Sequence, residues 1–178
     1  MGSPDTLTIL HFDDEVNTVL PIPNSLYNHF DTLHPSWVSD VIHNKRFYEF
    51  FTLQPKDCDP IRIRYQLTND YEVCNHCLST FVPQRDIAIF DLTRMKPEGG
   101  TEVVGKTLYR LALALQIPPE RLFVLTGYPN LFVDPEGGIE VPDAQKLLKP
   151  SDPKLIATKL ARLILRVVPT NQKKEGRS

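Results

Sequence analysis

Long apolar segments are absent from this chain of 178 residues: no run approaches the roughly 20 residues that span a bilayer, and no signal-peptide pattern opens it. Cysteine is scarce, and three residues, an odd number, argue against a disulfide framework and fit a reducing cytoplasm. The net charge of −2 lacks the basic excess of a nucleic-acid-binding surface. We therefore expect a cytoplasmic protein that binds neither membranes nor nucleic acid directly.

The composition is that of one globular domain. Apolar residues make up 41% of the chain and charged residues 24%, enough for a full core with an ordinary surface. No internal repeat is evident, and the 16 prolines fall mostly between the elements that we expect. The length predicts a single domain over residues 1–170, followed by a flexible tail over residues 171–178.

Short apolar runs predict buried strands, and each ends in residues that can do chemistry. The unbroken apolar run of residues 87–90, closed by polar residues, is typical of a strand buried on both faces, and it ends in Asp91. The other strand-like runs, residues 7–12, 122–125 and 147–148, end in Asp13 and Asp14, Thr126, and Lys149 respectively. Residues 61–67 alternate apolar and polar side chains, which predicts a half-buried strand at a sheet edge.

Helical patterns separate most of these strands. Ser36 precedes a rough apolar face that predicts a helix to about Phe51, and Asn69 or Asp70 can cap a second helix. Thr101 begins a third predicted helix. Ser151 or Asp152 caps the last one, which has Pro153 in its first turn and is expected to turn Leu155, Ile156, Leu160, Leu163, Ile164 and Val167 to one side.

Alternating strands and helices predict the fold class: an α/β protein with a doubly wound, five-stranded parallel sheet. By analogy with such folds we expect the strand order 2-1-3-4-5, with a crevice between strands one and three. Because the carboxyl ends of parallel strands share one edge, Asp13, Asp14 and Asp91 are then expected to face each other there.

A cluster of three carboxylates favours a bound cation, because the acids repel one another without it. Oxygen ligands that leave room for water suit Mg²⁺. A carboxylate can also attack phosphorus to give an aspartyl phosphate, whose oxygens need cationic partners. Lys149 can supply one such partner, and the Thr126 hydroxyl can donate a hydrogen bond.

The four strand ends, in this order, resemble those of response-regulator receiver domains, the phosphorylated half of two-component signalling. That family carries an acidic pair after strand one, an acceptor aspartate after strand three, a Thr or Ser after strand four, and Lys-Pro after strand five. The matching segments here are residues 9–15, 86–91, 124–127 and 147–150. The resemblance covers residues 7–15 and roughly 61–168. It implies a receiver or flavodoxin-like fold.

The resemblance implies that Asp91 accepts a phosphoryl group from a sensor histidine kinase or a phosphotransfer protein. It implies Mg²⁺ on Asp13, Asp14 and Asp91, with the backbone carbonyl of Thr93 as a further ligand. It implies that Thr126 and Lys149 contact the phosphoryl group and relay its arrival by a conformational change to a downstream protein target. A homodimer is compatible with this role, and no enzymatic activity is implied beyond phosphotransfer to the protein itself and autodephosphorylation.

Departures from the family pattern keep two alternatives open. An insertion enlarges the segment of residues 17–60 after strand one, Lys146 stands where the family often has an aromatic residue, and residues 128–142 are rich in Gly and Pro. These features fit a receiver-like interaction module that phosphorylation does not control. An Asp-nucleophile phosphohydrolase uses similar residues, but it needs a second Asp two residues after the nucleophile, where Thr93 stands.

Three simpler interpretations apply to individual residues. Asp13 and Asp14 alone would fit a turn or a helix cap. The Cys74 to Cys77 segment, with Cys58 earlier, is weak as a zinc site because it lacks a second close ligand pair, so the cysteines are better assigned to the core. His11 lies within the first strand and is expected to be a packed or hydrogen-bonded core histidine.

Overall fold

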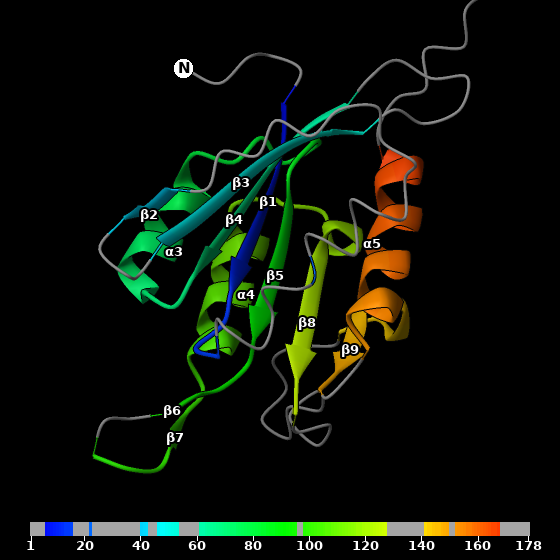
Figure 1. Cartoon of the computed structure of the whole chain (residues 1–178). Coiled ribbons are helices and arrows are strands. Elements are labelled where there is room, and N and C mark those ends of the chain that lie inside the picture. The colour runs from blue at the N-terminus through cyan, green and yellow to red at the C-terminus, as the bar shows by residue number, and fades with distance from the viewer. Residues whose placement is uncertain are drawn as a thin grey trace, which may run out of the picture.

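The computed structural model describes residues 6–15, 22, 40–42, 46–53, 61–95, 98–127, 141–149 and 152–167 (Figure 1). The strands of its main sheet are β1 (Thr6–Phe12), β2 (Asp40–Ile42), β3 (Arg46–Leu53), β4 (Ile61–Thr68), β5 (Ile87–Asp91), β8 (Leu122–Thr126) and β9 (Lys146–Leu148). The helices are α3 (Tyr71–Ser79), α4 (Val104–Ala114) and α5 (Pro153–Val167). A separate hairpin pairs β6 (Arg94–Met95) with β7 (Thr101–Glu102).

The sheet has the order β2-β3-β4-β1-β5-β8-β9. Its strands β4, β1, β5, β8 and β9 are all parallel, so in chain order these five run 2-1-3-4-5. This confirms the predicted α/β architecture, a flavodoxin-like arrangement. The inserted segment after β1 adds β2 and β3, which pair antiparallel beyond β4.

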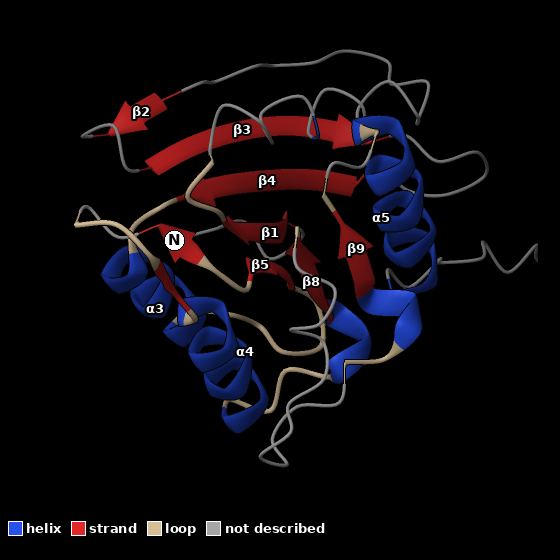
Figure 2. Cartoon of the chain, turned by 90° about the horizontal axis from the view of Figure 1, so that it is seen from below, coloured by secondary structure: helices blue, strands red, loops and turns tan. Residues whose placement is uncertain are grey.

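Each face of the sheet has its own apolar core. One face packs against α5 and the other against α3 and α4, and Figure 2 shows α5 apart from the neighbouring pair α3 and α4. Along β1, Leu7 and Ile9 belong to the α5 side, whereas Leu10 and Phe12 belong to the α3 and α4 side. Alternate side chains of a strand point to opposite faces, so a strand covered on both sides reads as a continuous apolar run.

Side-chain caps fix the starts of two helices as predicted. Asp70 accepts hydrogen bonds from the backbone N–H groups of Glu72 at 2.9 Å and Val73 at 3.2 Å. Asp152 accepts one from the N–H of Lys154 at 2.9 Å, at the start of α5. These bonds satisfy donors that have no partner inside the helix.

The helix predicted from Ser36 to about Phe51 is wrong. Residues 40–42 and 46–53 are strands instead, and β3 pairs with β4 along its whole length. Aromatic residues such as Phe47 and Tyr48 favour strands, and the outer edge of β4 supplies a hydrogen-bonding partner that helical periodicity does not reveal. For the same reason β4 is not a sheet edge, because β3 covers it.

Two further predictions need correction. The third helix begins at Val104 rather than Thr101, because Thr101 and Glu102 pair with Met95 and Arg94 in a hairpin that projects from the body of the domain (Figure 1). Leu155 is 54% exposed, whereas Ala157 and Ala161 join Ile156 and Leu160 in the buried stripe of α5. Small residues on that stripe let the helix lie close to the sheet.

Several predictions fall outside the described residues: the tail of residues 171–178, most of the insertion, Cys58, and the segment of residues 128–140 after β8. Among the helices that the structure describes, none combines the length and the apolar character needed to cross a membrane.

Candidate functional site

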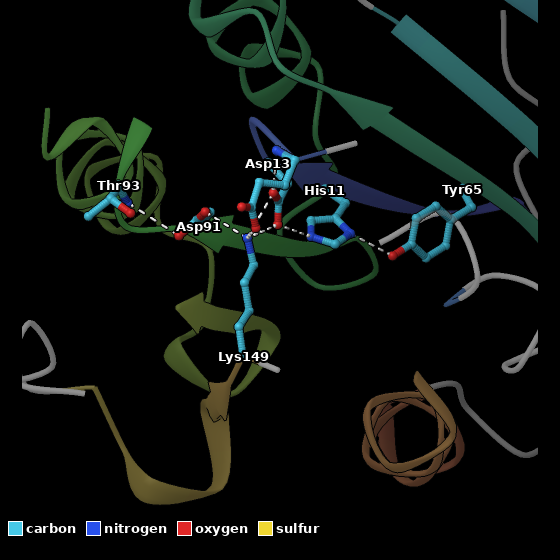
Figure 3. Close-up of polar contacts among 7 residues, drawn as sticks. His11, Asp13, Tyr65, Asp91, Thr93 and Lys149 are labelled. Atoms are coloured by element: carbon cyan, nitrogen blue, oxygen red, sulfur yellow. Dashed lines mark hydrogen bonds and ion pairs between the residues drawn. The ribbon is translucent and has the colours of Figure 1, made fainter. Parts of the chain in front are cut away.

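Asp13, Asp91, Thr93 and Lys149 of the predicted site lie together at the carboxyl edge of the sheet (Figure 3). Phe12 and Phe90 are paired in the register of β1 and β5, so Asp13 and Asp91 stand side by side at the next position. The Lys149 backbone N–H, just beyond β9, donates to the carbonyl of Thr126 at 2.9 Å. Parallel pairing therefore aligns four strand ends that are far apart in sequence.

Three carboxylates form the acidic part of this site. Oxygens of Asp13, Asp14 and Asp91 all lie within 4.8 Å of one another. Asp13 and Asp91 are buried, with exposed fractions of 0% and 3%, whereas Asp14 is half-buried. A set of hard oxygen donors at this spacing fits a metal ion, because a divalent cation offsets the repulsion between acids held this close.

Lys149 reaches across the edge and joins the acids. Its ammonium nitrogen lies 2.8 Å from Asp91 Oδ2 and 2.9 Å from both oxygens of Asp13. It is also 3.3 Å from Glu15 Oε2. The desolvation of the ammonium is outweighed by its carboxylate partners, above all Asp13, so the pKa of Lys149 is raised and the side chain stays charged.

The two buried acids differ in their proton affinity. Burial raises the pKa of Asp91 to about 6, and the charge of Asp13 adds to this, although the Lys149 hydrogen bond opposes it. Burial also acts on Asp13, but His11 and Lys149 outweigh it and hold the pKa of that carboxyl below its usual range. Asp13 is therefore the permanent anion of the pair, and Asp91 is the acid with an adjustable charge.

The backbone around Asp91 is fixed by close packing. The N–H of Thr93 donates to Asp91 Oδ1 at 3.3 Å. The N–H of Gly105, in the first turn of α4, donates to the carbonyl of Leu92 at 3.3 Å. A Cβ atom on Gly105 would lie 1.9 Å from the Asp91 carbonyl oxygen, so only glycine fits here.

A buried polar chain continues the site toward the α5 face (Figure 3). His11 Nε2 lies 3.5 Å from Asp13 Oδ2, and His11 Nδ1 lies 2.8 Å from the Tyr65 hydroxyl. His11 and Tyr65 are both fully buried. The expectation of a hydrogen-bonded core histidine is confirmed, but its link to Asp13 was not predicted.

The structure brings Asp13, Asp14, Asp91 and Lys149 together in one cluster. Thr93 contacts Asp91 through its N–H, and Thr126 is buried at the end of β8. Sequence reasoning missed Tyr65, Gly105 and the contact of Glu15 with Lys149. The spacing of His11 and Asp13 could have indicated their contact, because residues two apart on a strand have side chains on the same face.

Asp86 shows what a structural acid looks like in this fold. It is 2% exposed and lies at the opposite end of β5 from Asp91. Its carboxylate accepts the N–H groups of Thr8 at 3.0 Å and Val82 at 2.9 Å, and it pairs with Arg85. Cys74 and Cys77 are buried cysteines of α3 that form no disulfide, as expected for core residues. Neither feature belongs to the candidate site.

The fold and the acidic edge together define an α/β protein of flavodoxin-like arrangement with a candidate metal site where its parallel strands end. Neither the models of protein families nor the curated proteins contain a match for this chain. A fold alone does not determine function, so the geometry of the site has to indicate it.

Proposed function

We propose that this protein is a phosphoacceptor receiver of a two-component system, in which Asp91 takes a phosphoryl group from a histidine kinase or phosphotransfer protein with the help of Mg²⁺. The observation that carries the proposal is the position of Lys149, whose ammonium contacts both Asp13 and Asp91 beside a cluster of three carboxylates. A cation and a nucleophilic acid in contact are what phosphoryl transfer to a carboxylate needs.

The transfer itself exchanges one bond to phosphorus for another. A carboxylate oxygen of Asp91 forms the new P–O bond while the P–N bond of a phosphohistidine breaks, and the departing imidazole takes up a proton. With a pKa of about 6, Asp91 is mostly ionised at neutral pH and so is available as the nucleophile. Bound to Asp13, Asp14, Asp91 and the carbonyl of Thr93, Mg²⁺ would neutralise the phosphoryl charge.

Lys149 and Thr126 would report the modification. The Lys149 ammonium is held by carboxylates alone in the contacts described above, and phosphoryl oxygens would compete for it once Asp91 is modified. Because Lys149 directly follows β9 and stands shortly before α5 in the chain, its movement would reach the last strand and helix. We propose that the downstream protein target binds at β9 and α5, and that the protein works in the cytoplasm.

The proposal is tested by phosphorylation with a small donor. The protein is incubated with acetyl phosphate and Mg²⁺, and intact-mass spectrometry is expected to show the gain of one phosphoryl group. Asp91→Asn should abolish the gain because it removes the nucleophilic oxygen. Asp143→Asn, at a carboxyl whose side chain is 96% exposed, serves as the control and should be modified like the wild type.

Failure of acetyl phosphate to modify the wild type, together with failure of beryllofluoride and Mg²⁺ to bind, would contradict the proposal. An interaction module independent of phosphorylation would then be favoured. Steady turnover of a generic phosphate ester would instead indicate a phosphohydrolase.

A further inference from the structure

The polar chain from Tyr65 through His11 to Asp13 is unusual for its surroundings. His11 follows Leu7 and Ile9 on the face of β1 that packs against α5, and Tyr65 lies between Ile63 and Leu67 on the neighbouring strand β4. Both polar residues are fully buried among aliphatic side chains. Burying polar groups in such a core is unfavourable unless they are hydrogen-bonded, so their partners define what they do.

The contacts assign a direction to this chain. Asp13 has only acceptor atoms when ionised, so the facing His11 Nε2 must carry the proton. In a neutral imidazole Nδ1 is then an acceptor, and the Tyr65 hydroxyl, 2.8 Å away, is the group that can donate to it. Tyr65 thus selects the form of His11 that presents an N–H to Asp13, and it fixes the plane of the ring (Figure 3).

The two oxygens of Asp13 have different partners. Oδ1 accepts the backbone N–H of Glu15 at 2.8 Å and the Lys149 ammonium at 2.9 Å. In the described part of the chain, Oδ2 lies 2.9 Å from the Lys149 ammonium and 3.5 Å from His11 Nε2, as ion-pair contacts whose angles are not those of a hydrogen bond. Lys149 also contacts Asp91 and Glu15, whereas among the described residues His11 forms its ion-pair contact with Asp13 alone.

We propose that His11, oriented by Tyr65, is a positioning residue that holds the Asp13 carboxylate in place for the divalent cation. The inference rests on the proposed function, in which Lys149 leaves the acids for a phosphoryl group and His11 remains. Groups that orient a metal's ligands commonly contribute 10- to 100-fold to its affinity. A core polar pair without this role would affect folding and leave cation affinity unchanged.

The experiment measures Mg²⁺ affinity by calorimetric titration of the full-length, unphosphorylated protein. His11→Leu removes the donor, and we expect the Kd for Mg²⁺ to rise about 10-fold or more. His11→Gln keeps an amide N–H that can reach Asp13 and should recover most of the affinity. Tyr65→Phe removes only the hydroxyl that orients the ring, so it tests the pair even if His11→Leu folds poorly; its Kd should rise several-fold.

Tyr109→Phe is the matched control. Tyr109 is 1% exposed, and its ring packs edge-to-face on Phe90 on the other side of the sheet. The substitution removes a buried hydroxyl without touching the polar chain, so Mg²⁺ affinity should stay at the wild-type value. Thermal unfolding in EDTA shows for each variant whether the protein is folded.

Three outcomes decide the inference. Wild-type affinity in folded Tyr65→Phe and His11→Leu would overturn it while leaving the proposed function intact. Equal losses in His11→Leu and His11→Gln would overturn it too, because packing rather than the N–H would then be responsible. Absence of Mg²⁺ binding to the wild type would overturn both the inference and the proposed cation site.

Discussion

The Lys149 ammonium lies 2.8 Å from Asp91 Oδ2, although 58 residues of sequence separate the two side chains. The same nitrogen contacts Asp13, so one lysine balances the two buried acids of the site. A divalent cation bound by those acids would compete with the lysine for the same oxygens. The stability of the protein and its affinity for cations should therefore be coupled through Lys149.

Replacing Lys149 by Met tests that coupling. With the ammonium gone, Asp13 and Asp91 lose their shared partner, and breaking a buried ion pair in this way typically costs about 3–5 kcal/mol. We expect Lys149→Met to lower the free energy of unfolding in EDTA, measured by urea denaturation, and Mg²⁺ to restore more stability to the variant than it adds to the wild type. Lys146→Met, at a half-buried lysine paired with exposed Asp143, is the control and should change stability little. Equal effects of the two substitutions would contradict the coupling.

The pH dependence of Mg²⁺ binding follows from Asp91, whose pKa is raised to about 6. Below that pH the cation must displace a proton, so its affinity should fall by about tenfold per pH unit, whereas above it the affinity should level off. Calorimetry at a series of pH values gives the profile. Asp91→Asn should bind more weakly and lose the step near pH 6. A wild-type affinity that stays constant from about pH 5 to 7 would show that Asp91 does not bind the ion.

The same pKa predicts a stability profile in EDTA. Between its ordinary value of 3.8 and about 6, Asp91 binds more protons in the folded than in the unfolded protein. Its contribution to stability is thus present at low pH and lost as the pH rises through about 6. Asp91→Asn removes the acid but keeps its shape, so at pH 7 in EDTA it should raise the free energy of unfolding by roughly 1–3 kcal/mol.

Asp86→Asn is the contrasting substitution. The carboxylate of Asp86 accepts two backbone N–H groups, so replacing one of its oxygens by an amide should destabilise the protein by roughly 1–3 kcal/mol. Opposite signs for Asp91→Asn and Asp86→Asn in urea denaturation would separate the functional acid from the structural one. Destabilisation by both would indicate that Asp91 is also a structural acid.

Gly105 is predicted to be intolerant of any side chain. Because its Cβ would lie 1.9 Å from the Asp91 carbonyl oxygen, Gly105→Ala must move either α4 or the end of β5. We expect a loss of roughly 3 kcal/mol or more in thermal or urea unfolding, with weaker Mg²⁺ binding in any folded protein. Gly99→Ala is the control: its φ of +94° makes a side chain strained, but the space around it is open, so the cost should be about 1–2 kcal/mol. A Gly105→Ala protein as stable as the wild type would show that this close contact does not position Asp91.

The amino-acid sequence by itself determined the parallel sheet and the set of acids at its edge. An unbroken apolar run such as residues 87–90 is typical of a strand buried on both faces, and Asp91 ends that run. Lys149 follows the short apolar run of residues 147–148. Strand periodicity and chain order are local properties, so both could be predicted without coordinates. Caps such as Asp70 could be predicted for the same reason.

Only the tertiary structure decided which strands and side chains are neighbours. Pairing with β4 made residues 46–53 a strand rather than part of a helix, because a sheet edge offers hydrogen bonds that no sequence period encodes. Parallel register brought Lys149 onto Asp91 and Asp13, and the neighbouring strands β1 and β4 joined Tyr65 to His11. These contacts link residues dozens of positions apart, and only folding fixes their distances, on which charge, proton affinity and cation binding all depend.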